Sequence, residues 1–263
     1  MNEIRNKKLF LLDMDGTLYL GMRLFPSVPE FLAHIRKSGG KYVFMTNNSS
    51  KGVASYIEKM GKLGIKTEES DFLTSADATV AYLKEKNHRL IYVFGTKSFT
   101  AQLKKAGLPV TTERQGDIDC LCMGFDTELS FSKLEDACIL LQSNIDYIAT
   151  NPDYVCPTEY GYVPDCGSVA DMLYNATKKR PYVIGKPNTA MPLLAMKKYG
   201  YTKEETVIIG DRLYTDIACG IRAGIDTAYV LCGEGTQEDI KNTGITPGHV
   251  YRDIAEIYRK ISK

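Results

Sequence analysis

The length, composition and charge of the chain are those of an ordinary globular protein. Its 263 residues suffice for one large domain, or for a medium domain with a smaller one, and 44% of them are hydrophobic. The 33 Lys and Arg residues nearly balance the 32 Asp and Glu residues, and this excludes a strong overall field for nucleic acid or an anionic membrane. We therefore predict no nucleic-acid and no membrane partner, and expect any anionic ligand to be bound by a local site.

Neither the N-terminal residues nor the cysteines point to secretion or membrane insertion. The charged residues 1–8 precede only four apolar residues, 9–12, which is too short for the core of a signal peptide. No other run approaches the ~18 apolar residues of a membrane span. The seven cysteines are an odd number without CxxC spacing, which is typical of free thiols in a reducing compartment. We predict a cytoplasmic protein.

Short apolar runs alternate with helical patterns along much of the chain, which predicts a parallel sheet with crossover helices. Continuous apolar runs are typical of parallel strands that are buried on both faces. The expected strands of this kind are residues 9–12, 42–45, 207–209 and 225–231. The expected helices are residues 28–37, 53–63 and 189–199, each followed closely by glycine. The predicted fold class is α/β, with a doubly wound, Rossmann-like parallel sheet as its core.

The segment from about residue 78 to residue 180 holds a complete α/β set of its own. Its expected strands are residues 90–94, 120–123 and 147–150, and its expected helices are residues 99–106, 133–143 and 168–178. About a hundred residues with this content cannot be a loop of a compact domain. We predict an inserted α/β domain at 79–180 within a core made of residues 1–78 and 181–263.

Three polar residues stand directly after predicted strands of the core. They are Asp13, Thr46 and Asp211. A single such residue is usually a turn or a helix cap, but in open parallel sheets ligands bind beyond the carboxyl ends of the strands. Three strands that deliver polar side chains to one edge predict a binding site there.

Asp13 and Asp15 lie two residues apart and are followed by Gly16 and Thr17. Two carboxylates this close repel each other unless a cation or a proton relieves them. The arrangement suits one ionised nucleophile that also binds metal and one protonated general acid, and Gly16 lets the backbone turn sharply toward an oxyanion. The alternative for this tetrapeptide is a negatively charged turn.

Further candidates surround these positions in the expected fold. Asp211 is a candidate oxygen ligand for a hard cation such as Mg²⁺. Asp216 is expected to open the next helix, either as its N-cap or as a carboxylate that orients metal-bound water or a site lysine. Lys186 precedes the helix expected at 189–199 and can reach a phosphate there. Residues 46–50, which include Asn47, form either an anion cradle or a capped helix start.

In this order the motifs resemble those of the haloacid dehalogenase superfamily. They are the DxDGT run from Asp13 to Thr17, the strand-ending Thr46, Lys186, and Asp211 with Asp216. Over nearly the whole chain the sequence is also similar to the NagD-like and para-nitrophenylphosphatase-like branch of that superfamily. The runs that carry this similarity are Thr46-Asn47-Asn48-Ser49, Ala149-Thr150-Asn151-Pro152-Asp153, Pro157-Thr158-Glu159, Ile184-Gly185-Lys186-Pro187 and Gly210-Asp211-Arg212 through Thr215-Asp216. The inserted domain resembles the large α/β cap of this branch.

The resemblance implies a magnesium-dependent phosphomonoester hydrolase. Asp13 attacks phosphorus and forms an aspartyl-phosphate, and Asp15 protonates the leaving group and later deprotonates the attacking water. Mg²⁺ is held by Asp13, the backbone carbonyl of Asp15 and Asp211, with Asp216 behind them. An anionic nucleophile can approach an anionic phosphate only if positive charge offsets the repulsion, which agrees with these assignments.

The resemblance also implies how substrate is bound and which substrates fit. Thr46, Asn47 and Lys186 bind the phosphoryl oxygens. The substrate is a small phosphorylated metabolite, such as a sugar phosphate, a polyol phosphate or a nucleoside monophosphate, with para-nitrophenyl phosphate as an artificial substrate. The cap selects the leaving group, and a homodimer through the cap is plausible. The candidates for this selection are Asn151, Asp153, Glu159 and Asp165.

The alternatives are a non-catalytic phosphate-binding or scaffold protein on the same fold, and a phosphotransferase of the same superfamily. Binding alone does not require an acid at Asp15, which argues against the scaffold. The sequence contains no GxxxxGK[ST], and Lys186 is followed by proline, which excludes a P-loop. It also contains no GxGxxG after a strand, so a dinucleotide enzyme has no support.

Overall fold

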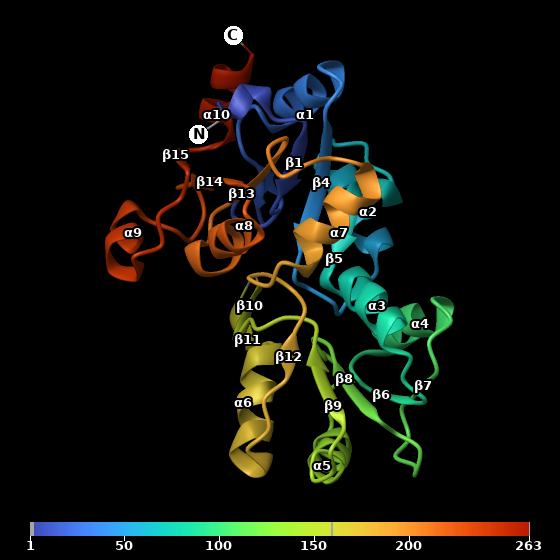
Figure 1. The fold of residues 1–263 in the computed structure, drawn as a ribbon. Helices are drawn as coiled ribbons and strands as arrows, with labels where there is room; N and C mark the ends of the chain where they lie inside the picture. Colours follow the sequence, from blue (N-terminus) through green and yellow to red (C-terminus); the bar gives the residue numbers. More distant parts are fainter. Residues whose placement is uncertain (1–2, 159, 263) are drawn as a thin grey trace. The chain divides into compact units, whose positions relative to one another are not determined.

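The computed structural model describes residues 3–158 and 160–262, and Figure 1 follows the chain through them. The chain divides into two compact units. The first unit comprises the residues up to Thr46, Val53–Leu73 and the residues from Lys186 onward; the second comprises Asn47–Gly52 and Thr74–Gly185. The second unit therefore differs from the segment 79–180 expected from the sequence, because it begins and ends beyond these bounds and also takes in residues 47–52.

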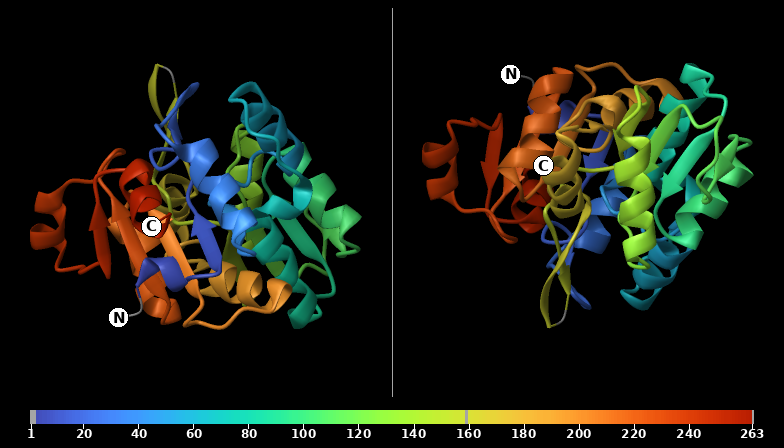
Figure 2. Two further views of the ribbon diagram at one scale, coloured as in Figure 1. Left: turned by 90° about the horizontal axis from the view of Figure 1, so that it is seen from above. Right: turned by 90° about the horizontal axis from the view of Figure 1, so that it is seen from below.

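The first unit is built on a six-stranded sheet with the order β15-β14-β13-β1-β4-β5. Its strands are β1 (Leu9–Leu12), β4 (Lys41–Thr46), β5 (Phe72–Thr74), β13 (Thr206–Gly210), β14 (Asp226–Val230) and β15 (His249–Tyr251). β1 pairs in parallel with both β4 and β13, and β14 pairs in parallel with β13 and β15. Figure 2 shows β13, β14 and β15 side by side. All four residues of β1 are buried, as expected for a central parallel strand.

Helices cover both faces of this sheet. The helices of the unit are α1 (Val28–Lys37), α2 (Val53–Lys62), α7 (Ala190–Tyr199), α8 (Ala218–Ala223), α9 (Gln237–Thr243) and α10 (Ile254–Ile261). One face of the sheet, with Phe10, Phe44 and Ile209, packs against buried residues of α1, α2 and α10. On the other face α8 lies so close that a side chain at Gly220 would overlap Ile208 of β13. The predicted doubly wound α/β fold is confirmed.

Short elements complete the first unit. A hairpin of β2 (Tyr19–Leu20) and β3 (Arg23–Leu24) fills the interval between the DxDGT run and α1. Two 3-10 turns lie at Ile4–Asn6 and Glu69–Asp71. None of these was expected from the sequence, because two- and three-residue elements are too short to show a period.

The second unit contains a five-stranded sheet with the order β12-β9-β8-β6-β7. Its strands are β6 (Ile91–Phe94), β7 (Val110–Thr111), β8 (Cys120–Met123), β9 (Asp146–Ala149) and β12 (Tyr182–Val183), all paired in parallel. Its helices are α3 (Ser75–Lys86), α4 (Lys97–Lys105), α5 (Phe131–Leu140) and α6 (Cys166–Thr177). Alternate strand residues such as Phe94 and Met123 point to one face and pack against α5 and α6. A separate hairpin of β10 (Val155–Thr158) and β11 (Gly161–Pro164) stands apart from this sheet (Figure 2).

Two observations concern the cysteines and the possibility of a membrane-spanning helix. All seven cysteines are free thiols, and four of them are buried. Within the described residues, no helix combines the length and the apolar character needed to cross a bilayer.

Candidate active site

The carboxyl ends of three neighbouring strands carry the polar residues singled out in the sequence. Asp13 follows β1, Asp211 follows β13, and Thr46 is the last residue of β4. The N–H of Asp13 donates to the carbonyl of Ile209 at 2.9 Å, so the first residue beyond β1 is still tied to β13. Because β1 pairs with both neighbours, these three positions share one edge of the sheet.

A buried lysine links two of the carboxylates at this edge. Lys186 Nζ donates to Asp13 Oδ1 and to Asp216 Oδ1, each at 2.6 Å, and the lysine side chain is only 3% exposed. Burial alone would lower the pKa of Lys186, but the two carboxylates outweigh it and leave that pKa raised. The lysine is thus held as a cation between two carboxyl groups.

Asp211 is the third buried carboxylate. Its Oδ1 accepts a hydrogen bond from Thr17 Oγ1 at 3.2 Å, and its Oδ2 accepts one from the N–H of Glu234 at 2.8 Å. Burial, and then repulsion by Asp216, raises the pKa of Asp211 to about 6. Sequence reasoning did not single out Glu234, because a backbone donor from a loop about twenty residues away leaves no local pattern.

Asp13, Asp211 and Asp216 form one cluster, with a carboxylate oxygen of each within 4.8 Å of the others. Burial raises the pKa of Asp13 well above its usual range; Lys186 opposes this rise, and the other two carboxylates add to it. A site that concentrates three acidic oxygens in this way is suited to a positively charged ligand.

Gly16 lies directly against this cluster. Its φ of +82° is in the left-handed region, and a Cβ at this position would overlap the carboxylate of Asp211. Gly233 approaches the same carboxylate from another loop. The absence of two side chains therefore leaves the Asp211 carboxylate in contact with two backbones.

The Asp15 side chain takes a different direction from the three clustered carboxylates. It is 51% exposed, and its two oxygens meet Lys59 Nζ at 3.2 Å and the Tyr19 hydroxyl at 3.3 Å. Neither of these partners was predicted. Tyr19 stands four residues after Asp15, and Lys59 belongs to α2, so only the tertiary fold brings all three together.

The expectation that Asp216 opens the next helix is wrong. It lies inside a π-helical turn, Leu213–Ile217, which precedes α8, and the position before this turn is Arg212. Asp216 Oδ2 accepts a hydrogen bond from the N–H of Arg212 at 3.3 Å, while Oδ1 faces Lys186. Asp216 is buried within this turn, and π-type turns are frequent at functional sites.

Asn47 belongs to the second unit, although it follows Thr46 directly. Its side-chain amide donates to Asp153 Oδ2 at 2.9 Å, and its carbonyl accepts from Ser75 Oγ at 2.6 Å and from Asn151 Nδ2 at 3.0 Å. Asn151 Nδ2 also approaches Asp165 Oδ1 at 3.3 Å. Among the candidates for leaving-group selection, Asn151 and Asp153 thus contact Asn47 and Asp165 contacts Asn151, whereas Glu159 lies outside the described residues.

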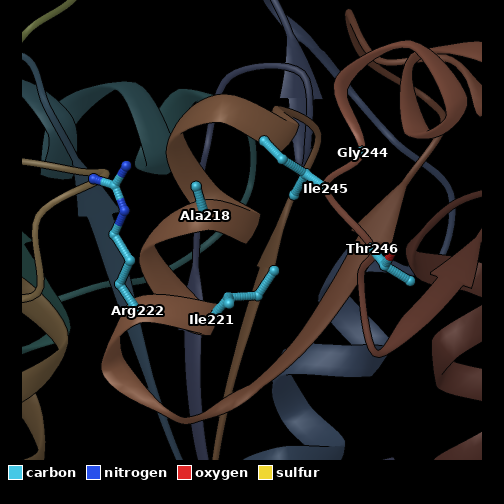
Figure 3. A pocket seen from close by; sticks show the side chains of 6 residues that line it. All are labelled: Ala218, Ile221, Arg222, Gly244, Ile245 and Thr246. Atoms are coloured by element: carbon cyan, nitrogen blue, oxygen red, sulfur yellow. The ribbon is translucent and has the colours of Figure 1, made fainter.

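A shallow hollow elsewhere on the first unit is a separate feature. Ala218, Ile221 and Arg222 of α8 line it together with the residues that follow α9, Gly244 to Thr246 (Figure 3). None of these six residues is among the predicted site residues, so this hollow does not mark the carboxylate cluster.

Comparison with known proteins identifies the family of the chain. A family model described as "Haloacid dehalogenase-like hydrolase" matches residues 10–109, and a related hydrolase model matches residues 183–257. The acid sugar phosphatase of Staphylococcus aureus is 30% identical over 261 residues, which are 99% of this chain and 100% of the relative. The chain belongs to the haloacid dehalogenase superfamily.

Solved structures place the chain in the NagD-like branch of phosphatases within this superfamily. A 4-nitrophenylphosphatase from Thermotoga maritima has a TM-score of 0.92 at 35% identity and covers 98% of each chain. NagD from Escherichia coli K-12 has a TM-score of 0.88 at 30% identity and covers 95% of this chain and 98% of its own. A glycerol phosphate phosphatase from Mycobacterium tuberculosis, solved in complex with magnesium, has a TM-score of 0.89 at 25% identity over 99% of this chain and 78% of its own. The predicted superfamily and branch are confirmed, and the chain is a phosphatase.

Proposed function

We propose that the chain hydrolyses phosphomonoesters of small hydroxylated metabolites in a magnesium-dependent reaction, with Asp13 as the nucleophile. The observation that carries this proposal is the Lys186 ammonium group, which lies 2.6 Å from both Asp13 and Asp216 at the edge where β1 and β13 end. A nucleophilic carboxylate that must meet an anionic phosphate needs such a fixed cation beside it.

The donor set fits a hard divalent cation. Asp13, Asp211 and Asp216 bring carboxylate oxygens within 4.8 Å of one another, and Mg²⁺ prefers oxygen ligands of this kind. We assign Asp13, Asp211 and the backbone carbonyl of Asp15 as the residues that would hold it, on the family motif that they match. Asp216 is assigned behind them, where it accepts from Lys186 and Arg212. The bound ion would supply positive charge to the phosphoryl oxygens and to the approaching carboxylate.

In the first chemical step a carboxylate oxygen of Asp13 forms a bond to phosphorus while the bond to the leaving oxygen breaks. Asp15 gives a proton to that leaving oxygen, and the product is an aspartyl-phosphate. Asp15 then takes a proton from the water that attacks phosphorus, which frees Asp13 and releases phosphate. Lys186 remains a cation throughout, contacts Asp13 and binds the phosphoryl oxygens of the substrate.

Three residues are proposed to bind the phosphoryl group. Thr46 offers a hydroxyl at the end of β4, and Lys186 offers its ammonium group. The Asn47 amide, which contacts Asp153 in this structure, is the third group. These roles are inferred from the position of Thr46 beside β1 and from the family motif that these residues match.

The substrate class is proposed from the chemistry named for the relatives. Acid sugar phosphatase and glycerol phosphate phosphatase are both named for phosphoesters of polyhydroxylated alcohols. We therefore propose a sugar phosphate or a polyol phosphate ahead of a nucleoside monophosphate. A homodimer through the second unit and a cytoplasmic location stay predictions, and sedimentation of the purified chain would test the first of them.

The test of this function uses 4-nitrophenyl phosphate with the purified protein. We expect release of 4-nitrophenolate with Mg²⁺, none after chelation by EDTA, and none from Asp13→Asn. Glu58→Gln, which changes an exposed carboxylate of α2 that pairs with Lys62, is the matched control and should keep wild-type activity. Equal rates with Mg²⁺ and with EDTA would contradict the metal requirement, and an active Asp13→Asn would remove the nucleophile.

A further inference from the structure

The Asp15 carboxylate sits in a closed arrangement of three side chains. Lys59 Nζ lies 3.2 Å from Asp15 Oδ1, the Tyr19 hydroxyl lies 3.3 Å from Asp15 Oδ2, and Lys59 Nζ lies 4.0 Å from the centre of the Tyr19 ring. Each carboxylate oxygen therefore has its own donor, and the two donors also contact each other. A carboxylate held at both oxygens has little freedom to rotate.

Tyr19 is a rigid donor because the fold fixes both its backbone and its ring. The ring is fully buried in the core of the first unit. The carbonyl of Tyr19 accepts a hydrogen bond from the N–H of Gly16 at 2.8 Å, so Tyr19 also closes the loop that carries Asp15. The hydroxyl therefore donates to Asp15 from a position that is fixed by packing and by the backbone.

Lys59 is anchored from the opposite side by the helix that carries it. Tyr56 and Met60 are the buried residues of α2, and helical geometry places Lys59 beside them at the border of the packed face. The Tyr19 ring attracts the ammonium group through its π face. The lysine side chain is 29% exposed, so solvent still reaches its ammonium group while the Tyr19 ring orients it.

This arrangement contributes little to the folded state as an ion pair. Exposed pairs between a lysine and a carboxylate add little to folding stability, because solvent screens them and their ordering costs side-chain entropy. Its consequence is geometric: it limits the Asp15 side chain to one direction. Removal of Lys59 or of the Tyr19 hydroxyl therefore allows a test of function without loss of the fold.

We propose that Lys59 and Tyr19 are positioning residues for the general acid of this phosphatase. The inference rests on the proposed function, in which Asp15 gives its proton to the leaving oxygen while that oxygen keeps the electron pair of the broken bond to phosphorus. Proton transfer requires the acid within hydrogen-bond reach of that oxygen, and a small displacement costs rate steeply. Lys59 and Tyr19 act through Asp15 and do not touch the reacting atoms.

The experiment compares two substrates that differ in their need for an acid. The alkoxide of glycerol phosphate cannot depart without a proton, whereas 4-nitrophenolate departs as a stable anion. The quantity measured is kcat/KM, which reports the steps up to the first irreversible one and so includes departure of the leaving group. The variants are Lys59→Met, Lys59→Arg, Tyr19→Phe and Asp15→Asn. Lys62→Met is the matched control, because Lys62 lies on the same helix and pairs with the exposed Glu58 at the surface.

We expect Lys59→Met and Tyr19→Phe to lower kcat/KM for glycerol phosphate about 10-fold more than for 4-nitrophenyl phosphate, a part of the ~10²–10⁴ that general acids contribute. Lys59→Arg keeps a donor and should restore most of the loss. Asp15→Asn should show a larger difference between the two substrates in kcat/KM. The double variant with Lys59→Met added should differ little from Asp15→Asn alone. Lys62→Met should leave both substrates unaffected.

Two results would overturn the inference, and they are distinguishable. If Asp15→Asn discriminates between the substrates but Lys59→Met and Tyr19→Phe lower both equally, the two residues are structural or bind substrate, and the proposed function stands. If Asp15→Asn itself does not discriminate, the acid role of Asp15 fails and the inference fails with it. Circular dichroism and urea unfolding of each variant confirm that the fold is retained.

Discussion

Gly16 has no side chain, and the structure leaves no room for one. A Cβ at Gly16 would lie 2.8 Å from Cγ of Asp211, whereas carbon atoms in contact are normally about 3.5–4.0 Å apart. The Gly16→Ala substitution therefore has to displace Asp211 or the loop by roughly 1 Å. The φ of +82° adds backbone strain, because an L residue in the left-handed region costs about 1–2 kcal/mol.

The expected result separates these two effects by a matched control. Gly64 also has a φ of +82°, and a Cβ there would meet nothing within 4 Å. Gly64→Ala should lose about 1–2 kcal/mol of unfolding free energy in urea, and Gly16→Ala should lose more, because its Cβ also overlaps the Asp211 carboxylate. Only Gly16→Ala should also lose activity, by about 10²-fold in kcat/KM, because a misplacement of about 1 Å in a catalytic site has this effect.

The assay is steady-state hydrolysis of 4-nitrophenyl phosphate at saturating Mg²⁺, combined with urea unfolding of each variant. A Gly16→Ala variant with wild-type activity would show that a Cβ at this position does not displace the Asp211 carboxylate or the loop from its active position. An equal loss of activity in Gly64→Ala would assign the effect to general destabilisation.

Three further outcomes are expected. Lys186→Met should lower the unfolding free energy in urea by about 3–5 kcal/mol, because Asp13 and Asp216 then stay buried without their cation, and a loss below about 1 kcal/mol would contradict that pairing. Mg²⁺ should raise the melting temperature of the wild-type protein, because a ligand that binds only the folded state stabilises it, and a shift that persists in Asp211→Asn would exclude this carboxylate as a ligand. At most the three partly exposed thiols should react with a thiol reagent in the native protein and all seven after unfolding; early reaction of the four buried thiols would contradict their burial.

The sequence was sufficient to predict four of the six strands in the sheet of the first unit, together with the residues at its edge, but not β5 or β15. Apolar runs predicted β1, β4 and β13, and Asp13, Thr46 and Asp211 follow from the positions at which those runs end. This inference works because parallel strands place their carboxyl ends together, so that local patterns determine a shared edge.

The remaining features depend on tertiary geometry that no local pattern carries. Asp216 was expected at a helix start, but the π turn that turns it toward Lys186 has no periodic signature. The contact of Lys59 with Asp15 joins residues 44 positions apart, and the Asn47 amide contacts Asp153 over 106 positions. Side-chain direction in such cases is set by packing, which propensity and spacing do not encode.

The central claim is that Asp13 becomes phosphorylated during turnover, and trapping this intermediate tests it most directly. The enzyme is mixed with substrate and Mg²⁺, quenched in acid within the first turnover, digested, and its peptides are analysed by mass spectrometry. The account predicts a phosphoryl group on the peptide that contains Asp13, absent in Asp13→Asn and removed when the quench is delayed until the substrate is consumed. Full turnover with no phosphoryl group on Asp13, or with the group on another residue, would contradict it.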